Sequence, residues 1–152
     1  MKQFHLPQQT LFVILPSVRT DAARKKLLLL ARWAPLFDEI SVRTIVLAPD
    51  ARNVLMQESL FLHLPFDLLS DPKQESASLL GCLQKRKIFG KEKTVCVSSL
   101  ILCSGEDFPP DLILRHVLPD SLLALFRKAQ KNRMASLEKC ARTLVDNPFS
   151  YC

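Results

Sequence analysis

Short apolar runs alternate with amphipathic stretches along most of the chain. Runs rich in β-branched and aromatic residues predict buried strands, because such side chains fit a pleated surface that is covered by other elements. The predicted strands cover residues 10–15, 42–47, 94–102 and 112–118, with a shorter extended segment at 66–69. The strand at 112–118 is expected to pair antiparallel to the one before it.

The segments between these strands carry apolar residues at helical spacing. They predict helices over 22–33, 51–62, 71–81 and 122–130, and a last helix that ends near 145. The apolar stripe of that last helix fits either a core-facing side, which is the commoner case, or a groove for a partner or a second copy. The residues of this stripe are Met134, Leu137, Ala141 and Leu144. The stretch 85–93 is expected to form a basic loop.

Capping residues mark the expected helix starts. Thr20 or Asp21 is the expected cap of the first helix, Asp50 of the second and Asp71 of the third. Pro35 is expected to end or kink the first helix, because proline removes a backbone hydrogen bond.

The order of these elements predicts an α/β fold with strands covered on both faces by helices. The order is strand, helix, strand, helix, short strand, helix, two strands and a helix, which is that of a thioredoxin-like three-layer α/β/α domain with a mixed central sheet. A further helix is expected at its C-terminal end. Residues 1–146 are expected to form this single domain, and residues 147–152 a flexible tail.

Charge and apolar content narrow the classes of partner. No apolar run approaches the ~18 residues that a spanning helix needs, and residues 1–5 lack the apolar core of a signal peptide. We therefore expect a cytoplasmic protein with no membrane contact. The net charge of +6 comes from scattered basic runs, which favour solvated surfaces over nucleic-acid binding because aromatic residues do not interleave with them.

The cysteines and histidines form no pattern of metal ligands. Five cysteines are present, but none belongs to a CxxC pair, and the three histidines are isolated from them. The sequence therefore predicts neither a metal site nor a dithiol centre nor a bound cofactor. The cysteines are Cys82, Cys96, Cys103, Cys140 and Cys152.

Three segments together resemble the peroxiredoxins, the alkyl hydroperoxide reductase and thiol-specific antioxidant family. Residues 16–23, PSVRTDAA, are similar to the family's P-x-x-x-[TS]-x-x-C motif, except that Ala23 stands at the cysteine position. Residues 66–72, FDLLSDP, are similar to its F-x-L-L-S-D-P segment, and residues 98–102 to its later strand. The resemblance covers roughly residues 10–128.

The resemblance implies that this chain has lost the family's peroxidatic cysteine. A peroxidatic cysteine in the first helical turn is activated by the helix dipole and by an arginine, and it attacks the peroxide as a thiolate. Pro16 and Thr20 are retained, but Ala23 has no nucleophile, and Cys96 stands nearest to the position of the family's arginine. The resemblance therefore implies a vestigial pocket and a non-catalytic binding or scaffold protein, with a protein partner and a homodimer as the expected assemblies.

A thiol-dependent peroxidase or oxidoreductase with a displaced cysteine is the alternative. Cys96 is the first candidate, because it is expected near the emptied pocket, where Arg19 and Arg24 flank the helix start. Cys82 is the second candidate. In the non-catalytic case, the same arginines would hold an anion or a partner's carboxylate at the helix start.

Overall fold

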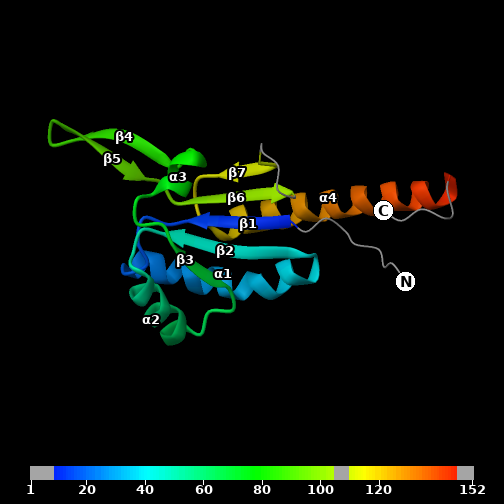
Figure 1. Ribbon diagram of the computed structural model, residues 1–152, viewed down its shortest axis with the longest axis horizontal. Coiled ribbons are helices and arrows are strands. Elements are labelled where there is room, and N and C mark those ends of the chain that lie inside the picture. Colours follow the sequence, from blue (N-terminus) through cyan, green and yellow to red (C-terminus); the bar gives the residue numbers. More distant parts are fainter. Residues whose placement is uncertain (1–8, 105–109, 147–152) are drawn as a thin grey trace.

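A five-stranded mixed sheet forms the centre of the protein in the computed structural model, which describes residues 9–104 and 110–146 (Figure 1). The strand order is β3-β2-β1-β6-β7. Strands β1, β2 and β3 are parallel, β6 is antiparallel to β1, and β7 is antiparallel to β6. The strands are β1 (Gln9–Ile14), β2 (Val42–Ala48), β3 (Asp67–Ser70), β6 (Ser99–Ser104) and β7 (Leu112–Leu114).

Alternating side chains divide the core into two apolar clusters, one on each face of the sheet. In β1, Leu11 and Val13 belong to the larger cluster, whereas Ile14 belongs to the smaller one. Strand β6 repeats this alternation, with Leu102 in the larger cluster and Ile101 in the smaller one. The central strands are thus buried on both faces, which explains their almost continuous apolar sequence.

Helices cover both faces, but unequally. Helices α1 (Asp21–Glu39) and α4 (Pro119–Asp146) contribute buried leucines to the larger cluster, and α3 (Glu75–Leu79) contributes Ala77 to the smaller one. Helix α2 (Arg52–Leu62) packs beside the edge strand β3. The predicted α/β/α arrangement with a mixed sheet and an additional C-terminal helix is confirmed. No helix in the described part of the chain is long and apolar enough to cross a membrane.

Helix α1 does not end at Pro35, one of the two expected effects of this proline, because the helix continues to Glu39. Proline removes one helical hydrogen bond, but its neighbours Ala34 and Phe37 are buried in the larger cluster. Phe37 also packs edge-on against Phe126 of α4, with ring centroids 5.8 Å apart. This packing offsets the lost hydrogen bond.

Helix α4 is a single 28-residue helix where two were predicted. Its first half packs on the sheet, and its second half extends past the sheet (Figure 1). Gln9 fixes the point of departure: its amide donates to the carbonyl of Ala129 at 3.1 Å and accepts from Asn132 at 3.0 Å. In the predicted stripe, Met134 is exposed, while the side chains of the other three residues lie outside the described part.

The single strand predicted at 94–102 is divided between two strands, and the predicted loop at 85–93 is wrong. Residues 83–96 form a β-hairpin of β4 (Leu83–Ile88) and β5 (Lys91–Cys96), a two-stranded sheet separate from the central one. Strand β5 ends at Cys96, and Val97 and Ser98 connect it to β6. Phe89 and Gly90 both have positive φ, the geometry of a tight hairpin turn. The dense charge of this segment hid the strand pattern.

The start of α3 also differs from the prediction. Asp71 does not cap a helix at the next residue; the helix begins at Glu75, after Gln74 in the left-handed region. The Asp71 carboxylate still accepts from the backbone N–H groups of Ser76 and Ala77, at 3.4 and 3.2 Å. Gly81 has φ +72° just after the helix, as expected for a helix end. Residues 147–152, the predicted tail, lie outside the described part.

Candidate functional site

The loop between β1 and α1, where the sequence places the vestigial pocket, is held by Asp50. The Asp50 carboxylate accepts hydrogen bonds from the Ser17 hydroxyl and the Val18 backbone N–H, both at 3.0 Å. Asp50 is not the cap of α2, because the N-cap position belongs to Ala51, which has no side-chain bond. Asp50 is therefore a tether between the loops that follow β1 and β2.

Thr20 is the N-cap of α1, as predicted. Its Oγ1 accepts a hydrogen bond from the backbone N–H of Ala23 at 3.0 Å. Ala23 is only 4% exposed, whereas Pro16 and Thr20 are exposed. The three residues assigned to the pocket thus lie around one helix start. Of these three, Thr20 alone has a polar side chain, and its hydroxyl accepts from a backbone N–H.

The two arginines beside this helix start differ in their surroundings. Arg24 points to α2 and forms an ion pair with Glu58, with 2.9 Å between Nη2 and Oε1. Hydrogen bonding to Glu58 raises the pKa of the Arg24 guanidinium further above its usual range. Arg19 is exposed and has no ion-pair partner among the described residues. On the next turn, Lys26 donates to the Ser98 hydroxyl at 3.1 Å, which links α1 to the start of β6.

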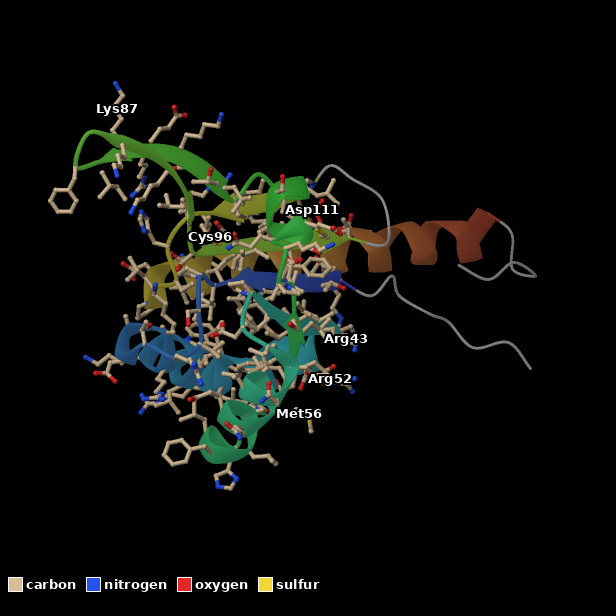
Figure 2. The ribbon with its side chains drawn as sticks, turned by 60° about the vertical axis from the view of Figure 1, so that its left-hand side comes forward. Arg43, Arg52, Met56, Lys87, Cys96 and Asp111 are labelled. Atoms are coloured by element: carbon tan, nitrogen blue, oxygen red, sulfur yellow. The ribbon has the colours of Figure 1, made fainter. Side chains whose placement is uncertain are left out.

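Cys96 lies at the base of the β4–β5 hairpin (Figure 2). It packs against the smaller apolar cluster with Cys82 and Ala77, on the α3 face of the sheet, whereas α1 covers the other face. Burial, and then the nearby Cys82 and Asp71, raise the pKa of the Cys96 thiol. This environment favours the protonated thiol, the less nucleophilic form.

A second thiol, Cys82, contacts a cation. Arg115, which follows β7, places Nη1 3.6 Å from the Cys82 sulfur and 3.1 Å from the hydroxyl oxygen of Ser99. A Cβ at Gly81 would make only an ordinary contact with this guanidinium, 3.7 Å from its other terminal nitrogen, so the positive φ and not the space favours glycine there. Both Cys82 and Ser99 are completely buried. Sequence reasoning named Cys82 but missed Arg115 and Ser99, because only the pairing of β6 with β7 brings them together.

Among residues 9–104 and 110–146, no group of three histidine, cysteine, aspartate or glutamate side chains is arranged to hold a metal ion.

Comparison with known proteins identifies the fold. The sequence matches no protein-family model and no curated protein. The structure is similar to that of Xanthomonas campestris peroxiredoxin Q, with a TM-score of 0.77 and 16% identity over 84% of this chain and 80% of the other.

Two further solved structures are similar to that of this chain. The bacterioferritin comigratory protein of Xanthomonas campestris gives a TM-score of 0.75 at 16% identity, over 84% of this chain and 81% of the other. Enterococcus faecalis AhpC gives 0.65 at 12% identity, over 95% of this chain and 81% of the other. The chain therefore has the thioredoxin-like fold of the peroxiredoxins.

Proposed function

We propose that this protein is a peroxiredoxin-like protein without peroxidase activity, which acts as a binding or scaffold protein. The observation that carries the proposal is Ala23, a buried methyl group at the start of α1, at the position that the motif resemblance gives to the reactive cysteine. Alanine cannot form the thiolate that attacks an O–O bond.

The surroundings of Ala23 support the same proposal. The Thr20 hydroxyl accepts from the Ala23 backbone N–H, and the Arg24 guanidinium is held by Glu58. An activated cysteine needs a cation beside the sulfur, and here the cation nearest in sequence is directed to α2. Of the two arginines expected to bind an anion, Arg19 alone has no ion-pair partner in the described part of the chain.

Peroxide consumption with a dithiol reductant tests the proposal. The expected result is no turnover of hydrogen peroxide or of an alkyl hydroperoxide above a blank without protein. The solved neighbour from Xanthomonas campestris, described for its alkyl peroxide reduction activity, is the positive control. Turnover by the wild-type protein that survives removal of trace metals would contradict the proposal.

The alternative function is a thiol peroxidase that uses a displaced cysteine, and the structure favours Cys82 over Cys96 for that role. Cys82 has a guanidinium at 3.6 Å and shares it with the Ser99 hydroxyl, whereas burial raises the pKa of the Cys96 thiol. In this reaction the thiolate takes one peroxide oxygen to become a sulfenic acid and the other leaves as water or alcohol. The dithiol then reduces the sulfenic acid.

Two variants decide between the thiols if turnover is found. Loss of activity in Cys82→Ser with retention in Cys96→Ser would establish Cys82 as the nucleophile, and the reverse result would establish Cys96. Because the Cys82 sulfur is completely buried, its oxidation requires the hairpin base to open. An intact mass that is unchanged after peroxide treatment would exclude both thiols.

A further inference from the structure

The β4–β5 hairpin is an exposed finger, and neither of its strands pairs with the central sheet. It forms a sheet of its own and projects beyond one end of the molecule (Figure 1). Its tip is apolar: Phe89 is fully exposed, and the preceding Ile88 is 36% exposed. Transfer of an exposed aromatic side chain from water to a less polar medium is favourable, because it removes apolar surface from water.

The sides of the finger are cationic. Five of the nine residues from 85 to 93 are lysine or arginine, and only Glu92 is acidic. Lys85 forms an ion pair with Glu92 at 3.8 Å, but none of the other four cations has an ion-pair partner among the described residues. These four are Arg86, Lys87, Lys91 and Lys93. Lys87 points away from the body of the protein (Figure 2).

The strand register concentrates three of these cations on one face. Arg86 lies directly opposite Lys93, and Ile88 directly opposite Lys91, so these four side chains share one face of the ribbon. Like charges directly opposite each other destabilise a strand pair, and nothing in the described part of the chain neutralises them. An anionic partner would remove this repulsion.

We propose that this hairpin docks on an anionic lipid surface, with Phe89 inserted among the headgroups and the four cations against lipid phosphates. The position of the ring favours lipid over single-stranded nucleic acid. Single-stranded nucleic acid would need aromatic rings within the cationic face, on which its bases could stack. The other side chains of that face are not aromatic; they are Gln84, Ile88 and Val95. Phe89 lies instead in the turn between β4 and β5, and this turn projects beyond the central domain, so a flat surface can reach it (Figure 1).

The cations lie at a suitable depth behind the ring. Arg86 and Lys93 are within four residues of Phe89, and the pairs recur every two residues, about 7 Å along the ribbon. Lys87 and Lys91 are closer still to the tip. Each cation near an anionic bilayer is expected to raise the affinity about fivefold, and the phenyl ring about tenfold or more. A peripheral contact of this kind needs no spanning helix, and the proposal departs from the expectation of no membrane contact.

Co-sedimentation of the full chain with lipid vesicles tests this docking. The expected result is binding to vesicles of phosphatidylcholine mixed with phosphatidylserine, weak binding to phosphatidylcholine alone, and loss of binding as salt is raised. Phe89→Ala should weaken binding about tenfold, and Lys91→Glu about fivefold or more. Both residues are exposed, so thermal unfolding of the two variants should match that of the wild-type protein.

Matched substitutions outside the hairpin distinguish docking through the hairpin from a nonspecific attraction of the whole protein to the vesicles. Phe61→Ala removes another exposed ring, from α2, and Lys25→Glu makes the same charge change on α1. Both variants should bind as the wild-type protein does. Equal losses in these controls, no binding to the anionic vesicles at low salt, or retention of a single-stranded oligonucleotide without vesicle binding would each overturn the proposal.

Discussion

Arg24 on α1 and Glu58 on α2 form an ion pair with 2.9 Å between Nη2 and Oε1, and a second hydrogen bond at 3.2 Å joins Nε to Oε2. The two parallel bonds make a bidentate contact, the strongest arrangement for an arginine and a carboxylate. Glu58 is largely shielded, with a side-chain exposure of 13%. The pair fixes α2 against the first turn of α1 and removes Arg24 from the Ala23 side of that turn.

Substitution of Glu58 by glutamine should lower the thermal stability, and the loss should depend on pH. Hydrogen bonds from Arg24 lower the pKa of the Glu58 carboxyl, against the opposing effect of burial. A carboxyl whose pKa is lower in the folded state stabilises the fold above the unfolded pKa of about 4.3, and this contribution is lost as the pH falls through the folded value.

Thermal melts of wild-type and Glu58→Gln protein between pH 7 and pH 3 measure this effect. The melting temperatures should differ at pH 7 and converge at the acidic end. Asp38→Asn is the control, because Asp38 is exposed on α1 and has no ion pair in the described part of the chain. A difference that is constant across the whole range would mean that the ion pair contributes nothing.

Substitution of Thr20 by alanine should destabilise the protein by about 1 kcal/mol, since the Ala23 N–H would lose its acceptor at the start of α1. Thr20→Ser retains the hydroxyl and should stay close to the wild-type value. Urea denaturation gives both free energies of unfolding. If Thr20→Ala is as stable as the wild type, water replaces the cap at no cost, and Thr20 is free for another role.

The amino-acid sequence was sufficient for β1 and β2, because apolar side chains dominate these two buried strands. The strand predicted at 10–15 is shifted by one residue from β1, and the strand predicted at 42–47 is one residue shorter than β2. The Thr20 cap was also predictable, since its signal is local. These elements depend on burial and on hydrogen bonds between near neighbours, which a single sequence records.

Two features could not be predicted from the sequence, because they depend on contacts between residues far apart in the chain. The continuity of α1 through Pro35 depends on the burial of Ala34 and Phe37 against the sheet and α4, which no local rule contains. In the group of Cys82, Ser99 and Arg115, the contact of Arg115 with Ser99 follows from the pairing of β6 with β7, and its contact with Cys82 joins residues 33 positions apart. Phe89 lies inside the basic run 85–93, contrary to the expectation that aromatic residues do not interleave with these runs, and the hairpin exposes it.

Cys96 should react slowly with iodoacetamide at neutral pH. Burial raises the pKa of its thiol, and the neighbouring Cys82 and Asp71 add to this effect, so the reactive thiolate is scarce until the pH exceeds the ordinary thiol range. Alkylation of the peptide that contains Cys96, followed by mass spectrometry from pH 7 to pH 10, gives the profile. The urea-unfolded chain is the reference and should react faster at each pH; a plateau already at neutral pH would show an activated cysteine instead.

Introducing a thiol at position 23 tests whether this scaffold supports peroxide chemistry. In Ala23→Cys the new sulfur lies in the first turn of α1, where the helix dipole favours the thiolate. We expect turnover of peroxide with a dithiol above that of the wild-type protein, but limited, because Arg24 is held by Glu58. The double variant with Glu58→Gln, which weakens that hold, should then be faster than Ala23→Cys alone.

The neighbouring position provides the control for this gain. Ala22 lies in the same turn but is exposed, so Ala22→Cys adds an equally dipole-proximal thiol without the buried setting of residue 23. Its turnover should stay near that of the wild-type protein. If the two variants are equally active, the helix start alone accounts for the reactivity and the pocket around Thr20 adds nothing. If Ala23→Cys alone gains activity, the geometry for peroxide reduction persists around a residue that cannot use it.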